Sequence, residues 1–373
     1  MAEEKKGPSA PPASAPPAAG GAAAAPGGAQ PAPKPAPDPA ALEAALAAFE
    51  AANRDELTRD GVAVKAAAPA AAAPARPMGI DAKTVAAKAK AAVSGPAERP
   101  HVVVFQDVTK TYFPGSRKEF TAIRDVSFVV EDLPGKGEFV CLLGPSGCGK
   151  STVLRLIAGL EPQHPPTEGL VRVFGKRIRA PGADRGMVFQ AYTSFDNRTV
   201  LENVAFGLEC RGVSRREREE LAREWIGKVG LSVEKDADKF PHQLSGGMQQ
   251  RVAIARTLIL KPRIILMDEP FGALDPIIRT QMQDTLVQLW REVEATVFFV
   301  THSIEEAVFL GDRAYLFSNS PGTILREFKI PPADRPAREM QRSPHFQEVV
   351  YELRDMIDRL EQEQVARRAA ARG

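Results

Sequence analysis

Apolar and polar residues alternate along this chain in a pattern that changes from one segment to the next. Short runs rich in Val, Ile and Phe, namely HVVVF, EFVCLL, LVRVF, RGMVF, RIILMD and ATVFFVTH, indicate β-strands. Amphipathic stretches with apolar residues at helical spacing lie between these runs. Because strands that alternate with helices usually pair in parallel, the pattern predicts an α/β domain with a mainly parallel sheet, preceded by some antiparallel strands. We expect one such domain over residues 101–330.

Two further helices follow from the spacing of apolar residues. The first lies in and just after the charged segment SRREREELAREW. Leu221, Trp225 and Val229 recur there at helical spacing, which leaves the charged opposite face to solvent. Residues 331–373 are expected to form a proline-punctuated linker and then an amphipathic helix. We favour packing of that last helix on its own domain over a short coiled-coil contact with another subunit. Its apolar stripe consists of Phe346, Val349, Val350, Leu353, Met356, Ile357 and Leu360.

Composition separates the first hundred residues from the rest. Residues 1–100 are dominated by Ala and Pro and contain few large apolar side chains. Such a segment cannot offset the entropy that ordering would cost, so we expect a low-complexity extension that is mostly disordered. Short helices are favoured only near Ala40–Asn53 and Asp81–Val93. We interpret the extension as a flexible tether, with a docking arm for a partner as the alternative.

Charge and cysteine content narrow the classes of function. The formal net charge is +2, which argues against a broad nucleic-acid footprint, and we expect no nucleic-acid partner. No run reaches the length of a membrane span, and the first residues lack the apolar core of a secretory signal. Cys141, Cys148 and Cys210 have no metal-site spacing, so reduced thiols in the cytoplasm are expected.

The segment GPSGCGKST matches the pattern of a phosphate-binding loop between a strand and a helix. Its glycines allow successive backbone N–H groups to point at phosphate oxygens. Lys150 can reach the β- and γ-phosphates, the Ser151 hydroxyl can bind Mg²⁺, and Thr152 can support the phosphates. Cys148 is interpreted as a small spacer rather than as a reactive thiol. The loop residues expected to contact the nucleotide are Gly144, Pro145, Ser146, Gly147, Cys148, Gly149, Lys150, Ser151 and Thr152.

Two carboxylates end the buried run RIILMDEP. Asp268 stands at the carboxyl end of the predicted strand, where ligands gather in open α/β sheets, and can hold Mg²⁺ directly or through water. Glu269 follows and is displaced from that role. A second acidic group beside the γ-phosphate can polarise an attacking water. The pair therefore predicts a magnesium ligand and a general base.

Ser245, Gly246 and Gly247 lead into another predicted helix, within QLSGGMQQRVAIAR. Bare N–H groups and the helix dipole make such an end attractive to an anion. The segment has no lysine of its own to hold a phosphate. An anion brought there by another element is therefore expected.

GPSGCGKST, LSGGMQQR and IILMDEPFGALD, in this order, resemble the nucleotide-binding subunit of an ABC transporter over about residues 102–330. The resemblance implies an ABC-type P-loop NTPase with an antiparallel β subdomain and a helical subdomain at about residues 191–250. It implies ATP and Mg²⁺ as cofactors and a head-to-tail pair of ATP-binding subunits, taken to be a homodimer. In that dimer Ser245, Gly246 and Gly247 of one copy face the γ-phosphate held by Lys150 of the other.

Further roles are implied by the same resemblance. Gln190 matches the glutamine that contacts Mg²⁺ and the water, and His302 matches the histidine that contacts the γ-phosphate and orients Glu269. Asp275 matches a loop that communicates across the dimer, although helix capping is its simpler role. Tyr112 is the candidate for stacking on adenine, with Phe113 as its rival.

Several strings, including GKRIRAPGADRGMVFQ and THSIEEAVFLGDRAYLFSNSPGTI, resemble the nitrate, sulfonate, taurine and bicarbonate uptake ATPases. This implies a motor on the cytoplasmic face of the membrane, with two integral membrane permease subunits and, indirectly, an extracytoplasmic solute-binding protein. Tyr192 and Phe195 are candidates to contact the permease. The segment SFDNRT departs from the apolar or Trp-containing segment usual there. The alternatives are the motor of another ABC transporter class and a soluble non-transport ABC ATPase.

Overall fold

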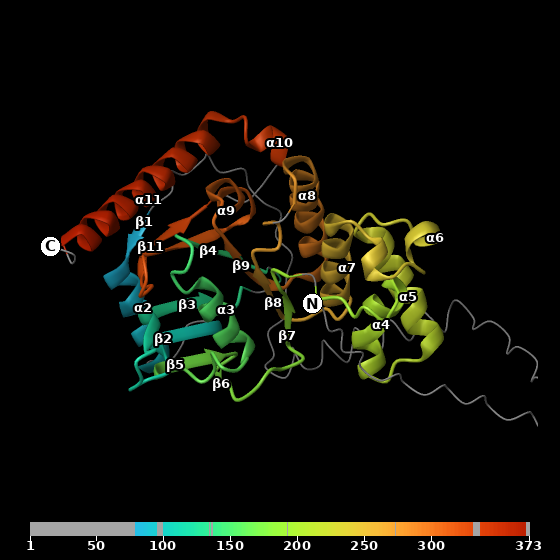
Figure 1. Cartoon of the computed structure of the whole chain (residues 1–373), viewed down its shortest axis with the longest axis horizontal. Coiled ribbons are helices and arrows are strands. Elements are labelled where there is room, and N and C mark those ends of the chain that lie inside the picture. Colours follow the sequence, from blue (N-terminus) through green and yellow to red (C-terminus); the bar gives the residue numbers. More distant parts are fainter. Residues whose placement is uncertain are drawn as a thin grey trace, which may run out of the picture. The chain divides into compact units, whose positions relative to one another are not determined.

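Two β-sheets lie at the centre of the fold (Figure 1), which is a computed structural model. The larger sheet has seven strands in the order β1-β11-β10-β4-β9-β8-β7, parallel from β10 to β7 and antiparallel at β11 and β1. Its strands are β1 Gly79–Asp81, β4 Phe139–Leu143, β7 Arg185–Val188, β8 Ile264–Asp268, β9 Thr296–Thr301, β10 Arg313–Phe317 and β11 Ile324–Lys329.

The smaller sheet is antiparallel in the order β3-β2-β5-β6. Its strands are β2 His101–Tyr112, β3 Phe120–Glu131, β5 Glu168–Val173 and β6 Lys176–Arg177. The predicted α/β fold, with a mainly parallel sheet and separate antiparallel and helical parts, is confirmed. The structure describes residues 79–94, 100–133, 135, 137–191, 193–272, 274–330 and 336–370.

The core consists of two apolar layers, one on each face of the seven-stranded sheet. Along β4, Phe139 and Leu143 belong to one layer while Val140 and Leu142 belong to the other, because successive strand side chains point to opposite faces. The second layer also includes residues of the antiparallel sheet and of α3 (Lys150–Ala158). The first layer includes residues of the helices Gly246–Leu258, Pro276–Val293, Ile304–Leu310 and Pro344–Ala370, which lie on the opposite face of the sheet from α3.

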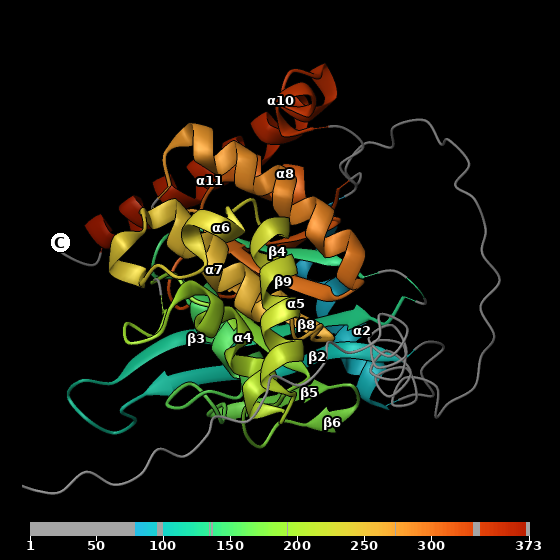
Figure 2. The same cartoon turned by 90° about the vertical axis from the view of Figure 1, so that its right-hand side faces the viewer.

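A group of short helices forms the helical subdomain, which faces the viewer in Figure 2. Thr199 starts the first of them with a capping box, in which its side chain accepts from the Glu202 N–H and Glu202 bonds back. Trp225 and Val229 of the predicted apolar face are buried and Leu221 is partly buried. The helices are α4 Val200–Cys210, α5 Arg215–Lys228, α6 Val233–Asp236 and α7 Gly246–Leu258.

The folded part begins upstream of residue 101. Gly79–Asp81 forms β1, an edge strand on β11, and Ala82–Ser94 forms α2, which lies against β2 and β3. The boundary expected at residue 101 therefore differs from the structure. The short helix expected near Asp81–Val93 is present as α2, and among its described side chains Val85 and Ala89 are buried. The helix expected near Ala40–Asn53 lies outside the described residues.

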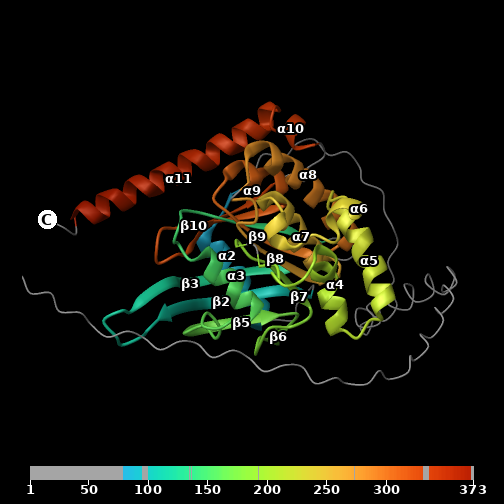
Figure 3. The same cartoon turned by 45° about the vertical axis from the view of Figure 1, so that its right-hand side comes forward.

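The C-terminal helix α11 (Pro344–Ala370) packs on α9 (Ile304–Leu310) of its own domain. Phe346, Val349 and Val350 are buried there, as the expected apolar stripe requires. In Figures 1 and 3 α11 crosses the side away from β2 and β5. Two more helices precede it, α8 Pro276–Val293 and α10 Ala337–Met340. Within the described residues, no helix combines the length and apolarity that a bilayer crossing needs.

Candidate functional site

The glycine-rich loop joins β4 to α3. Lys150, the first residue of α3, is buried, and its Nζ donates hydrogen bonds to the carbonyl oxygens of Gly144 at 2.8 Å and Pro145 at 2.9 Å. The bare N–H groups at the start of α3 lie on the same loop as this ammonium. Together they provide the positive field and the donors that a phosphate group requires.

Gly149 shows why this loop needs glycine. It caps α3 in the left-handed conformation with φ 98°, which L side chains rarely adopt. A Cβ at this position would overlap Cγ2 of Ile123 and would lie 2.8 Å from the carbonyl oxygen of Ala122. The loop therefore lies directly on β3, and any larger residue would displace it.

Ser151 and Asp268 bring hydroxyl and carboxylate oxygens together. Ser151 Oγ donates to Asp268 Oδ1 at 2.7 Å, and Arg155 Nη2 lies 3.6 Å from Asp268 Oδ2. Burial raises the pKa of the Asp268 carboxyl, opposed by the Ser151 hydrogen bond and the Arg155 charge. The described residues hold no group of three or more His, Cys, Asp or Glu suited to a metal. Since Mg²⁺ is commonly held by few protein oxygens plus phosphates, this donor set fits Mg²⁺ bound with a nucleotide.

Two polar side chains, those of Gln190 and His302, meet the Glu269 carboxylate. Glu269 follows β8 with φ 45°, a conformation that costs a non-glycine residue about 1–3 kcal/mol. Its backbone N–H donates to the Val300 carbonyl at 3.1 Å, which ties the bend to β9. Gln190 Nε2 donates to Glu269 Oε2 at 3.3 Å, and His302 Nδ1 lies 3.4 Å from the same oxygen. The ends of β7, β8 and β9 thus present one carboxylate between an amide and an imidazole.

A cavity of about 380 Å³ contains most of these groups. The phosphate-binding loop bounds the cavity on one side and Glu269, after β8, bounds it on another, so a molecule inside it contacts both. Its lining consists of Tyr112, Phe120, Ala122, Ser146, Gly147, Gly149, Lys150, Ser151, Thr152, Gln190 and Glu269.

Two aromatic rings reach this cavity. The Tyr112 hydroxyl shares a hydrogen bond of 3.3 Å with Thr152 Oγ1, whereas Phe113 is 65% exposed and is absent from the lining. Phe120 pairs with Tyr112 across β2 and β3, lines the cavity and is half exposed. The geometry therefore favours Tyr112 over Phe113 for stacking. Phe120 is a second candidate that motif matching missed, because its position depends on strand register.

The segment from Ser245 to Gly247 begins α7. Ser245 Oγ accepts from the Met248 N–H at 3.4 Å, and Gly246 and Gly247 form the first turn of the helix. None of the three lines the cavity, whose described lining comes from elsewhere in the chain. A single copy thus presents the phosphate loop and this second helix end as separate elements.

Asp275 caps α8. Its Oδ1 accepts hydrogen bonds from the N–H groups of Ile277 and Ile278, both at 3.1 Å. Ile278 also lies close to the second glycine, since a Cβ on Gly247 would be 3.1 Å from its Cγ2. The Asp275 loop therefore adjoins the start of α7, and the simpler capping role is present in this copy.

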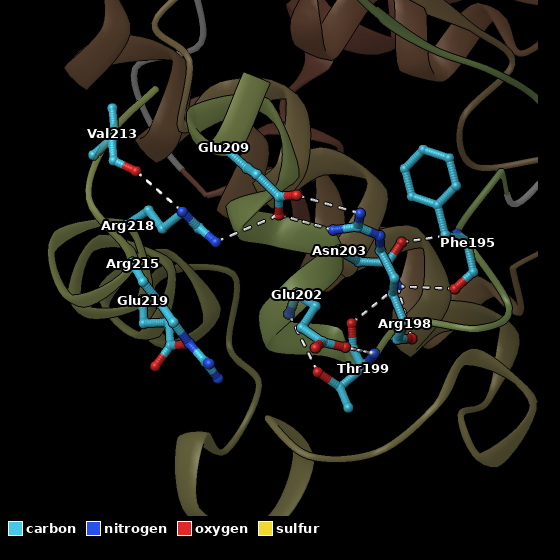
Figure 4. Close-up of polar contacts among 10 residues, drawn as sticks. All are labelled: Phe195, Arg198, Thr199, Glu202, Asn203, Glu209, Val213, Arg215, Arg218 and Glu219. Carbon is cyan, nitrogen blue, oxygen red and sulfur yellow. Dashed lines mark hydrogen bonds and ion pairs between the residues drawn. The ribbon is translucent and has the colours of Figure 1, made fainter. Parts of the chain in front are cut away.

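The loop after Gln190 is held by Asn203, which is fully buried (Figure 4). Asn203 Oδ1 accepts from the Phe195 N–H at 2.8 Å, and Nδ2 donates to the carbonyls of Phe195, Arg198 and Thr199. The Phe195 ring remains 38% exposed. Tyr192 lies outside the described residues.

Arg256 links the same loop to α7. Its guanidinium donates to the Thr193 carbonyl at 2.8 Å and to Thr193 Oγ1 at 3.0 Å, and it lies over the Phe195 ring. The loop that starts at Gln190 is thus attached to the helix that starts at Ser245. No motif signals Arg256 or Asn203, because their roles depend on tertiary contacts.

Cys148, within the phosphate-binding loop, is fully buried. Burial raises the pKa of its thiol, although the nearby Lys150 opposes this. Because the thiolate is the reactive form, Cys148 is suited to a spacer role.

The family model described as ABC transporter matches residues 124–272 of this chain. The nitrate import ATP-binding protein NrtD of Synechocystis is 48% identical over 58% of this chain and 79% of its own length. The taurine import ATP-binding protein TauB of Rhizobium johnstonii is 46% identical, over 63% of this chain and 88% of its own. The chain belongs to the ABC transporter ATP-binding proteins, which are ATPases.

Two further comparisons agree with this. The bicarbonate transport ATP-binding protein CmpD of Synechocystis is 38% identical over 71% of this chain and 92% of its own. An ATP-binding cassette solved as a dimer in a post-hydrolysis state with ADP and Pi superposes with a TM-score of 0.53 and 36% identity, covering 61% of this chain and 99% of that one. That structure and a second dimeric cassette share this fold.

Proposed function

We propose that this chain is the motor subunit of an importer, coupling ATP hydrolysis in a dimer to the uptake of a small solute through two membrane permease subunits. The observation that carries the proposal is the meeting of Gln190, Glu269 and His302 beside the phosphate loop. The motor would act at the cytoplasmic face of the membrane, with an extracytoplasmic binding protein delivering solute.

The chemistry assigned to the site is hydrolysis of the terminal phosphate of ATP. Lys150 and the N–H groups of the loop would hold the β- and γ-phosphates, and Tyr112 would stack on adenine. Glu269 would accept a proton from a water molecule while the water oxygen attacks the γ-phosphorus. The bond between the γ-phosphorus and the oxygen that bridges it to the β-phosphate would break, and ADP would leave. His302 and Gln190 would orient the Glu269 carboxylate and the water.

Ser151, Asp268 and Gln190 would hold Mg²⁺. When bound, the ion supplies charge neutralisation for the phosphate oxygens. The hydrogen bond between Ser151 and Asp268 already brings two of these oxygen donors together.

The dimer would complete the site. Ser245, Gly246 and Gly247 begin a helix but lie apart from the cavity of their own copy, so a second copy could bring them to the γ-phosphate. Contacts that exist only in the closed pair would shift the population toward closure when ATP binds. Asp275 would then lie near the junction of the copies. The dimeric state of the related cassettes supports this arrangement.

The solute is proposed from the relatives, which are named for nitrate, taurine and bicarbonate. A small anion of the nitrate, sulfonate, taurine or bicarbonate class fits all three. Phe195 is the described residue that we assign to permease contact, because its ring stays partly exposed on a firmly held loop.

Purification from gently solubilised membranes tests the transport role. Glu269→Gln protein with MgATP should accumulate in the closed form and retain its partners. Recovery of a multi-span permease would support the proposal, and the binding protein encoded with it could be screened against these anions. Recovery of ribosomes or DNA-repair factors instead would contradict transport while leaving the ATPase assignment intact.

A further inference from the structure

Glu306 is a buried carboxylate that the proposed mechanism does not use. It lies in α9, 6% exposed, in the helix that follows His302. Burial raises the pKa of this carboxyl, and a hydrogen bond from Thr301 and the charge of Arg279 oppose the rise. A carboxylate buried at this cost is worth examining for what it holds in place.

One side of Glu306 holds the turn that contains His302. Thr301 Oγ1 donates to Glu306 Oε2 at 2.5 Å and also accepts the Ser303 N–H at 3.0 Å. Ser303 Oγ in turn accepts the Glu306 N–H at 3.2 Å. The residues on both sides of His302 are therefore attached to Glu306, and His302 Nδ1 lies 3.4 Å from Glu269.

The other side of Glu306 reaches the Asp275 loop. Arg279 Nε lies 3.8 Å from Glu306 Oε1, and Nη2 of the same guanidinium donates to the Leu274 carbonyl at 3.0 Å. Gln283, one turn further along α8, donates to Glu306 Oε1 at 3.5 Å. Leu274 immediately precedes Asp275, so one side chain connects the loop to Glu306.

We infer that Glu306 is a positioning residue for hydrolysis, which holds the His302 turn through Thr301 and ties it to the Asp275 loop through Arg279. This inference rests on the proposed roles of His302 and Asp275. Glu306 does not belong to the described lining of the cavity, so it acts through the residues that it holds. Glu306 determines where the His302 imidazole lies relative to Glu269, and it couples the position of the Asp275 loop to that imidazole.

The direct test measures steady-state ATP hydrolysis by the full chain carrying Glu306→Gln. The amide keeps the size of the side chain but cannot accept from Thr301 and pair with Arg279 as the carboxylate does. A displaced His302 should lower kcat about ten- to hundredfold while KM for ATP stays within about twofold, because the phosphate loop is untouched. A loss of folding alone would instead change the amount of active protein and the unfolding temperature.

Two glutamates serve as matched controls. Glu327→Gln changes a buried carboxylate of β11, whose Oε1 lies 3.0 Å from Arg313 Nη1. Glu138→Gln changes another buried carboxylate, whose Oε1 lies 2.8 Å from Nε of Arg313. Both should leave kcat unchanged. If Glu138→Gln lowers kcat as much as Glu306→Gln, the effect is general to buried ion pairs and the inference is overturned.

A double-variant cycle tests the connection to the Asp275 loop. Arg279→Gln alone should lower kcat, and Arg279→Gln with Glu306→Gln should fall little further, because both changes break one linkage. Additive losses would show that the two residues act separately and would overturn the linkage.

Thr301 keeps the inference testable if Glu306→Gln fails to fold. Thr301→Val removes the donor and should lower kcat, while Thr301→Ser restores the hydroxyl and should recover it. Equal activity of the two would contradict the inference. If Glu269→Gln hydrolyses ATP like the unaltered protein, the proposed roles of Glu269 and His302 fail and the inference fails with them. If Glu269→Gln is inactive and Glu306→Gln is not, only the inference fails.

Discussion

The two carboxylates at the sheet edge and the loop after Gln190 are held in different ways. Asp268 and Glu269 accept hydrogen bonds from other functional side chains, Ser151 and Gln190 respectively. In the helical subdomain, Asn203 and Arg256 bond mainly to backbone groups of one loop. A hydrogen bond between two side chains can be replaced by one to a ligand, whereas hydrogen bonds to backbone groups fix the conformation of a loop. The comparison indicates that the first region is arranged for chemistry and the second for presenting a surface.

The largest effect should come from the sheet edge. Glu269→Gln removes the proposed base and should lower the hydrolysis rate by about 10²–10⁴-fold. ATP binding should persist, since Lys150 and the phosphate loop are unchanged. Single-turnover hydrolysis beside a nucleotide-binding titration checks both halves. Normal turnover would remove Glu269 from the mechanism.

A mixing experiment tests whether the two regions meet across copies. Lys150→Ala disables the phosphate loop and Ser245→Arg disables the helix end, so each variant alone should be inactive. In a mixed dimer one site retains both elements, and random pairing should restore about a quarter of the unaltered activity. Activity can be followed as the two proteins are combined and exchanged. No recovery under exchange would oppose a composite site.

In the helical subdomain the expected effect is on stability. Asn203→Leu keeps a buried side chain but leaves the Phe195 N–H and nearby carbonyls unpaired, which should destabilise the protein by about 1–3 kcal/mol. Denaturant unfolding measures this loss. Thr199→Ser is a mild control, because it retains the capping hydroxyl. The affinity for ATP should not change in either variant. A large loss of affinity would contradict the separation of the two regions into one for chemistry and one for presenting a surface.

The smallest effect concerns Asp268. Burial raises the pKa of its carboxyl in the fold, so the charged form costs stability at neutral pH, and this cost disappears as the pH falls through the raised value. Asp268→Asn should therefore raise the unfolding temperature by roughly a few degrees at neutral pH without nucleotide or Mg²⁺. The difference should shrink on acidification, which thermal scans across pH would detect. A pH-independent difference would exclude this cause.

Local patterns predicted much of the sheet edge. Lys150 was predicted from the glycine-rich loop that follows a strand, and Asp268 and Glu269 from the carboxyl end of a buried strand. The position of such residues depends little on the rest of the chain. The resemblance to ABC subunits added Gln190 and His302, which no local pattern would have placed beside Glu269.

Residues whose roles arise from tertiary contacts were not predictable. Phe120 reaches the cavity only through the register of β2 and β3, and Asn203 acts on a loop whose course is set by the surrounding helices. Glu306 reads as an ordinary charged residue of an amphipathic helix until its burial is known. The helix near Asp81–Val93 was expected, but its packing against β2 and β3 was not, because the segment has few large apolar side chains.

The short strand β1 has a practical consequence. It pairs with β11 through Gly79, Ile80 and Asp81 and so covers a sheet edge that would otherwise expose a row of unpaired backbone groups. A shortened protein that begins at His101, where the expected domain starts, would uncover this row and favour strand-to-strand aggregation. Expression work should therefore keep the chain from upstream of Gly79, and a cleavable tag belongs ahead of that strand.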